Sequence, residues 1–495
     1  MEFNYQKLTS DSISLVENKQ FAVDCKINEL LEENISKILC LDASSKVDGY
    51  EVNNKEVVVR GKINYKLVYE DINKEIRSLN YLSDYEDTLL SNDITSTDKI
   101  FVESGVSNVS SSGIDIVRLN AVVNIKIYKV TSKESESIVN NLENCYYKTE
   151  NILRSDFVTT VASSFDLEEE TTLNDTIIDI LMLDSAISLD NAICNDNKIT
   201  LEGTSVVAVT YRTNKGVFVQ KFDIPFSEEV EGACSTFSTC YSKLSIDSTK
   251  VVLLDEDKTI RVKLAVDNRS IVFNKTEAVV VNDMYSMTDE LNIKKENITV
   301  ENFDCYKSFS DRVAVEATLK DNLNGKIIGV ICPKNTVASA RVKEGILTIE
   351  GVVSATLIYE NETVCSLLIE APYKVETECD YKKISVSGIV QDISAKSLKD
   401  NAILLDSALK FCIKCFDVNN MQVVTFAEEN GKIKQNNSAI SIIVIDSKKT
   451  FFDVAKSLST TPEELAKQNP TLVEPLSLGD KLYYYRKLTK SKEAE

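Results

Sequence analysis

The chain has 495 residues, 43% hydrophobic and 27% charged, a length that predicts about three or four domains. Its net charge of -21 opposes contact with phosphate groups, so neither nucleic acid nor an anionic lipid surface is an expected partner. The sequence contains no histidine, which excludes Ser-His-Asp and Cys-His catalysis and metal sites of the H-E-x-x-H type.

The cysteines indicate free thiols, not a disulfide scaffold or a metal site. Twelve of them are spread along the chain from Cys25 to Cys415, and no apolar stretch of signal-peptide or membrane-spanning length accompanies them. Cys412 and Cys415 form the one C-x-x-C, and strand alternation puts their sulfurs on opposite faces. We therefore expect no metal, no cofactor, no membrane span and no enzymatic activity.

One pattern is written three times along the chain. It reads VVVRGKINYKLVY at 57–69, ITLEGTSVVAVTY at 199–211 and LTIEGVVSATLIY at 347–359. Each copy has a glycine followed eight residues later by a tyrosine, and the pairs are Gly61 and Tyr69, Gly203 and Tyr211, and Gly351 and Tyr359. The interval between copies is far longer than a solenoid repeat, so the pattern predicts a tandem array of whole domains.

Strict alternation of apolar and polar residues around each glycine predicts a long, half-buried strand. The glycine is in register with the apolar face, where a missing side chain permits a bend or the close approach of another element. A polar turn and a second alternating segment follow, which predicts an antiparallel hairpin. Similar segments also occur before and after each copy of the pattern. Together they predict three β sandwiches or barrels at 20–131, 160–273 and 312–418, with connectors 132–159 and 274–311 of undetermined structure.

The C-terminal segment has a different character. Residues 440–495 hold nine Lys or Arg against eight Asp or Glu, in contrast to the acidic remainder. Thr450 with Asp453 predicts the start of one helix, and Thr461 with Pro462 predicts the start of a second. A short apolar run precedes these helices and a strand follows them, so we expect a small β-α-α-β module at 438–487.

This module resembles a LysM domain in the order T-F-F-D-V-A-K, T-x-E-E-L, Asn-Pro and L-G-D-K-L. The resemblance implies binding of N-acetylglucosamine glycans, as in peptidoglycan, in a groove between two loops. Lys448 and Lys449 stand where the family has Gly-Asp, which favours a protein contact, and Phe451 and Phe452 can alternatively pack the small core. The candidate groove residues are Lys448, Lys449, Thr450, Phe451, Phe452, Asn469, Leu476, Leu478, Gly479 and Asp480.

The three repeats resemble the SPOCS domain, through the glycine strand, the following tyrosine, and the segments containing Pro225-Phe226 and Pro372-Tyr373. Three such repeats before one LysM module are similar to the SipL-like family of spore-coat morphogenetic proteins. That resemblance implies an adaptor that binds a SpoIVA-like coat-basement ATPase and other coat proteins, in the mother-cell cytoplasm at the forespore surface and in the spore coat. The alternative is a peptidoglycan-binding protein of the spore cortex or cell wall.

Overall fold

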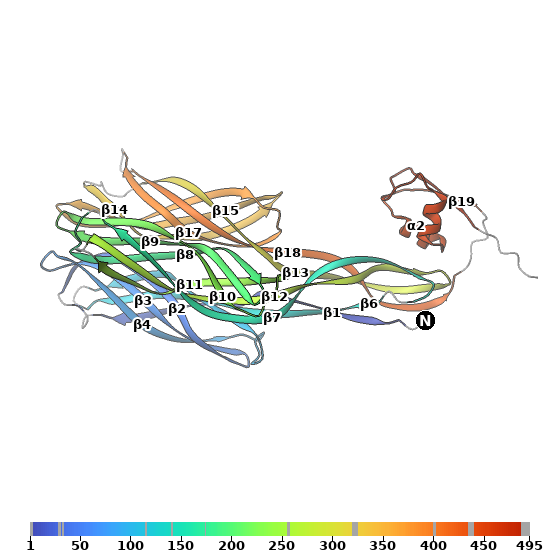
Figure 1. Ribbon diagram of the computed structural model, residues 1–495, viewed down its shortest axis with the longest axis horizontal. Coiled ribbons are helices and arrows are strands. Elements are labelled where there is room, and N and C mark those ends of the chain that lie inside the picture. The colour runs from blue at the N-terminus through green and yellow to red at the C-terminus, as the bar shows by residue number, and fades with distance from the viewer. Residues whose placement is uncertain are drawn as a thin grey trace, which may run out of the picture.

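The computed structural model describes residues 3–27, 31, 34–113, 116–139, 142–173, 175–254, 258–318, 325–398, 402–433 and 440–486. Within them the chain forms three consecutive units of six strands each, followed by a small module that carries the helices (Figure 1). All the paired strands are antiparallel. The prediction of several mainly antiparallel β domains is therefore confirmed.

Each unit divides its six strands between two three-stranded sheets in the same way. The first, sixth and fifth strands form one sheet, and the second, third and fourth form the other. Unit 1 contains β1 (Tyr5–Lys26), β2 (Ile35–Asn53), β3 (Glu56–Asp71), β4 (Ile76–Leu90), β5 (Ile100–Ser112) and β6 (Arg118–Ile138). Unit 2 contains β7 (Cys145–Thr172), β8 (Asp179–Asn195), β9 (Lys198–Thr213), β10 (Gly216–Glu231), β11 (Ser238–Leu254) and β12 (Thr259–Ser286). Unit 3 contains β13 (Asp289–Thr318), β14 (Lys326–Lys343), β15 (Ile346–Asn361), β16 (Thr363–Glu378), β17 (Lys383–Ser397) and β18 (Ala402–Lys432).

The two sheets of a unit enclose one hydrophobic core, as in a β sandwich. In unit 1, Ile63 and Tyr65 of β3 are fully buried and belong to the same cluster as Val123 and Ile125 of β6. The signature strands β3, β9 and β15 are central in their sheets, so both of their edges are paired. The alternation read from the sequence thus corresponds to burial against the opposite sheet.

The signature glycines lie directly opposite an aromatic residue of the neighbouring strand. Gly61 pairs with Tyr85, and the other two units repeat the arrangement with Gly203 opposite Phe226 and Gly351 opposite Tyr373. A Cβ atom at any of the three glycines would overlap the aromatic ring and a backbone carbonyl oxygen of the strand on the other side. The glycine therefore provides the space in which the ring crosses the strand.

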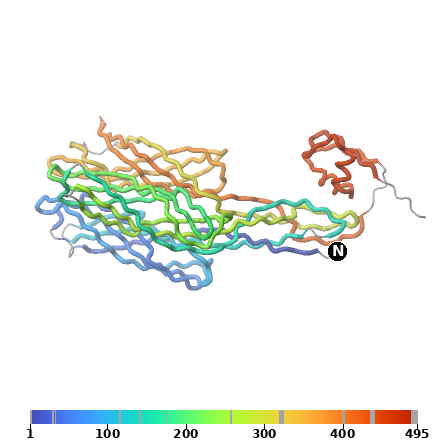
Figure 2. The backbone as a smooth tube through the Cα atoms, in the orientation of Figure 1, coloured from blue at the N-terminus to red at the C-terminus, as the bar shows by residue number. Residues whose placement is uncertain are grey.

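The outer strands continue beyond the sandwiches and form a stalk. We define the stalk as residues 5–13 with 130–138, 145–155 with 275–286, and 289–302 with 417–432, where each unit is reduced to two paired strands. The three ribbons run side by side and share a thin core that includes Val280, Val300 and Val423 (Figures 1 and 2). The expected connectors 132–159 and 274–311 are thus largely strand, and the predicted unit bounds fall inside β1, β6, β7, β12, β13 and β18.

The three sandwiches pack against one another into a single body. Cys40 and Val68 of unit 1, Met182 of unit 2 and Ile331 of unit 3 share one buried cluster. Strand β18 also separates two cores, because Cys412 packs in the unit 2 cluster and Cys415 in the unit 3 cluster. The opposite orientation predicted for these two thiols is confirmed, and all twelve cysteines are free.

Candidate functional site

The C-terminal module consists of two short strands and two short helices, β19 (Ile440–Val444), α2 (Phe451–Leu458), α3 (Pro462–Gln468) and β20 (Lys481–Tyr485). Thr450 caps α2, since its hydroxyl accepts the Asp453 amide at 3.3 Å and its own amide donates to the Asp453 carboxylate at 2.8 Å. Thr461 caps α3 by accepting the Glu464 amide at 3.0 Å, with Pro462 in the first helical turn. Both helices begin where the capping residues predict.

The two loops named as a candidate groove lie side by side. The Leu476 amide donates to the Lys449 carbonyl at 2.8 Å, and the Gly479 amide donates to the Ile445 carbonyl at 2.8 Å. Gly479 has φ of +90°, a backbone conformation that favours glycine, and the Asp480 carboxylate accepts the Ser477 amide at 2.7 Å. The loop at 476–480 is therefore fixed beside the loop that enters α2.

Several of the predicted groove residues hold the module together and do not face solvent. The Asn469 amide group donates to the carbonyls of Leu465 and Tyr483 and accepts the Tyr483 amide, which ties the end of α3 to β20. Leu476 and Phe451 are buried in the module core. Lys448 and Leu478 are exposed, and Lys449 pairs with Asp446 at 2.7 Å. The exposed part of the predicted groove thus reduces to the two loop tips.

Phe452 contacts the tip of the stalk. Its ring meets Tyr285 of β12 edge-on, with centroids 5.2 Å apart, and Tyr285 stacks in turn on Tyr146 of β7 at 5.4 Å. The Tyr285 hydroxyl donates to the Thr460 carbonyl at 2.6 Å, and burial raises the pKa of that hydroxyl above its usual value. The stalk therefore contributes an aromatic side chain to the core of the module.

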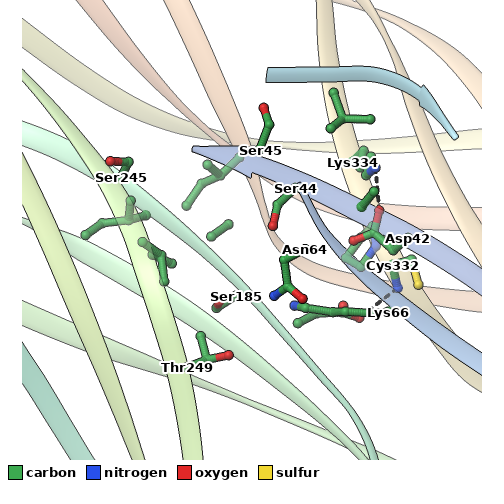
Figure 3. Close-up of a pocket in the computed structure, with 18 of the residues that line it drawn as sticks. Asp42, Ser44, Ser45, Asn64, Lys66, Ser185, Ser245, Thr249, Cys332 and Lys334 are labelled. Atoms are coloured by element: carbon green, nitrogen blue, oxygen red, sulfur yellow. Dashed lines mark hydrogen bonds and ion pairs between the residues drawn. The ribbon is translucent and has the colours of Figure 1, made fainter. Parts of the chain in front are cut away.

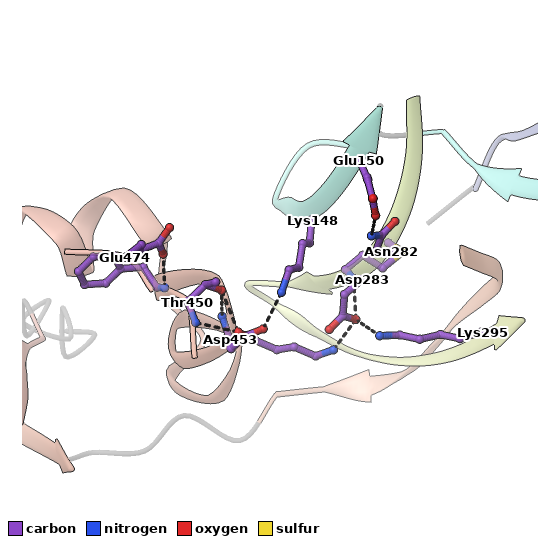
Figure 4. Close-up of polar contacts among 11 residues, drawn as sticks. Lys148, Glu150, Asn282, Asp283, Lys295, Thr450, Asp453 and Glu474 are labelled. Carbon is purple, nitrogen blue, oxygen red and sulfur yellow. Dashed lines mark hydrogen bonds and ion pairs between the residues drawn. The ribbon is translucent and has the colours of Figure 1, made fainter. Parts of the chain in front are cut away.

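Charged side chains also join the module to the stalk (Figure 4). Lys456 of α2 lies 2.7 Å from Asp283 of β12, which also pairs with Lys295 of β13 at 3.1 Å. Lys148 of β7 reaches Asp453 of α2 at 3.4 Å. The face of α2 that carries Phe452, Asp453 and Lys456 is therefore turned to the stalk and covered by it.

Among the described residues of the module, one face of its sheet is apolar and exposed. Strand pairing places Ile440 opposite Tyr485 and Ile442 opposite Tyr483, and Ile442 is 61% exposed. We call these four residues, together with Val444, the β19–β20 face. This face is not predicted by the sequence, because strands of five residues alternate in the same way whichever side is buried. The run of three tyrosines in β20 is the one local signal for it.

The SipL, SPOCS domain family model matches the chain at residues 34–114 and 176–254. The first match covers β2 to β5 of unit 1, and the second covers the corresponding strands β8 to β11 of unit 2. No curated protein and no solved structure matches the chain.

In the part of the chain that the structure describes, no helix has the length and apolarity needed to cross a membrane.

The two matched regions occupy the same four strands of two successive units, so the match and the internal repetition agree. In these two regions the chain is similar to the SPOCS domain of SipL.

Proposed function

We propose that this chain is a non-enzymatic adaptor of spore-coat assembly, in which three SPOCS-type units carry a LysM-type module. It binds a SpoIVA-like coat-basement ATPase and other coat proteins, and it helps to tether the coat to the forespore surface from the mother-cell cytoplasm. The family match in units 1 and 2 supports the sporulation context. The observation that carries the adaptor role is the module at the end of a long stalk, with an apolar sheet face directed outward.

The β19–β20 face is the surface that we assign to the protein partner. It is apolar and exposed, and it lies on a module that is close to neutral while the rest of the chain is strongly acidic. Exposed apolar patches rimmed by polar groups are typical of protein contacts. Lys448 adds a positive charge outside this face, which suits an acidic region of the partner.

Replacing Ile442 by aspartate should abolish measurable capture of the ATPase without unfolding the module, because Ile442 is 61% exposed. Leu368→Asp, at an apolar residue of β16 with 65% exposure, is the matched control and should bind normally. The measurement is surface plasmon resonance on the purified full chain. Normal binding by the Ile442 variant would remove the β19–β20 face from the proposal.

Reversing Lys448 and Lys449 to glutamate should weaken the same association by roughly threefold to tenfold and reduce its salt dependence, as expected for charges at the rim of an interface. The change also breaks the Lys449–Asp446 pair, so Lys448→Glu alone separates the two effects. Lys343→Glu in unit 3 alters another exposed lysine and should leave the affinity unchanged. Equal affinities at 50 and 300 mM salt for all variants would contradict the charge contribution.

Glycan binding is the second candidate function, and the adjacency of the loops at 446–450 and 476–480 supports it. The test is co-sedimentation of the full chain with purified peptidoglycan, compared with a Gly479→Val variant that strains the second loop at its positive φ. Glycan binding that depends on Gly479, without capture of the ATPase, would favour a cortex or cell-wall protein over the adaptor.

A further inference from the structure

A cavity of about 640 Å³ lies where the three units meet. Its walls come from β2 to β5 of unit 1, from β8, β9 and β11 of unit 2, and from β14 and β17 of unit 3. The volume lies within the range of about 300 to 1,000 Å³ that is usual for small-molecule sites. In Figure 3, Ser44, Asn64 and Ser185 are grouped in the middle, with Asp42 and Lys334 on one side and Ser245 and Thr249 on the other.

The lysines around this cavity are already engaged within the protein. Lys334 pairs with Asp42 across units 3 and 1, and Lys46 pairs with Asp247 across units 1 and 2. Two further lysines are also engaged: Lys62 lies 3.6 Å from Asp48, and Lys66 donates to the Leu183 carbonyl at 2.6 Å. A ligand with a net charge would have to break these pairs, so the electrostatics favour a neutral ligand.

Asp42 Oδ1 in the cavity wall lacks a hydrogen bond but is ion-paired with Lys334. Among the described residues, three further buried polar atoms of the wall have neither a hydrogen bond nor an ion pair, one in each unit. They are the Ser45 hydroxyl, the Asp184 Oδ1 and the Asn335 Nδ2. Their neighbouring atoms are satisfied, because Asp184 Oδ2 accepts the Cys332 amide at 2.9 Å and Asn335 Oδ1 accepts the Tyr373 hydroxyl at 2.6 Å. Asp184 is 9% exposed, and a buried polar atom without a partner destabilises a fold.

We propose that this cavity binds a neutral, polyhydroxylated small molecule of the sugar or polyol class. A ligand hydroxyl donates to Asp184 and another accepts from Asn335, while the Ser45 hydroxyl can do either. These three contacts come from three different units, so an occupied cavity links the units to one another. The remaining serine and threonine hydroxyls of the wall suit the same ligand chemistry.

The test is isothermal titration calorimetry of the full chain with glucose, trehalose, N-acetylglucosamine and myo-inositol. We expect saturable binding of at least one of these compounds at one site per chain. Asp184→Asn and Asn335→Leu should each weaken that binding by roughly tenfold or more, because each removes one of the proposed contacts. Asp179→Asn, on the same strand β8 but outside the cavity and partly exposed, is the control and should bind as the unchanged chain does.

Stability separates loss of a contact from loss of the fold. Burial raises the pKa of Asp184, so its ionisation opposes folding once the pH exceeds the usual range of a free carboxyl group. Asp184→Asn removes that charge and should leave the unfolding temperature at pH 7 no lower than that of the unchanged chain. Failure of all four compounds to bind would show a cavity filled by water alone, and binding retained by both cavity variants would place the ligand elsewhere; either result overturns the proposal.

Discussion

Replacing Gly203 by valine is expected to lower the free energy of unfolding by about 3 kcal/mol, near the upper end for inserting atoms into a packed core. The added carbons would meet the Ser188 carbonyl on one side and the Phe226 ring on the other, and neither can move without disturbing a paired strand. The measurement is chemical denaturation followed by circular dichroism and tyrosine fluorescence, since the chain has no tryptophan.

Two other strand glycines provide the control for this prediction. Gly49 of β2 and Gly105 of β5 have no atom within 4 Å of an added Cβ. Replacing either by alanine should change the free energy of unfolding by less than about 1 kcal/mol, with stabilisation the expected direction. If Gly105→Ala destabilised the chain as much as Gly203→Val, the close approach of Phe226 would not be the reason for the glycine.

The sequence predicted the signature strand but not the partner of its glycine. Alternation shows which residues of β9 share a face, and the buried positions of Leu201, Val207 and Val209 agree with it. The pairing of Gly203 with Phe226 depends on the register between β9 and β10, which is set by the turn at Thr213–Gly216 and by packing against the opposite sheet. No local pattern in a single sequence predicts which residues of two neighbouring strands lie opposite each other.

The stalk was missed for a related reason. Beyond the end of the third strand of each sheet, only two strands of the unit remain paired. These strands have less core to pack against, so the alternation of apolar and polar residues is weaker there. Val280 and Val423 have valine neighbours in the sequence, but only the assembly of three ribbons buries Val280, Val300 and Val423 together. The cavity between the units could not be predicted for the same reason. Each unit contributes one polar atom that has neither a hydrogen bond nor an ion pair, and nothing in the sequence of its strand marks that residue.

The position of the module on the stalk also could not be predicted, since Tyr285 and Phe452 are far apart in the chain and neither carries a motif for the other. The sequence left two interpretations of Phe452 open, a groove residue or a core residue. In the structure Phe452 is 8% exposed, in a cluster that also contains Tyr285 of unit 2. The core interpretation therefore describes Phe452, with a core partner that lies outside the module.

Tyr285→Ala is expected to release the module from the stalk. The change removes the ring between Phe452 and Tyr146 and the hydrogen bond to Thr460, and truncation of a buried aromatic side chain costs about 3 to 5 kcal/mol. A core as small as that of the module has little stability of its own to offset this loss. Hydrogen exchange of the α2 amides should accelerate by at least tenfold, while the amides of β3 and β15 keep their protection.

The conservative variant Tyr285→Phe distinguishes the ring from its hydroxyl. It keeps the aromatic contacts and loses the hydrogen bond to the Thr460 carbonyl, so the expected loss in the free energy of unfolding is only about 1 kcal/mol and the α2 amides should stay protected.

Release of the module in Tyr285→Ala should also uncover the face of α2 that carries Phe452, Asp453 and Lys456. If that face completes a glycan site, the alanine variant will bind peptidoglycan more tightly than the unchanged chain, whereas an adaptor that uses only the β19–β20 face will show no such gain. Unchanged exchange of α2 in the alanine variant would mean that the charged pairs around Asp283 and Asp453, and not the aromatic contact, hold the module in place.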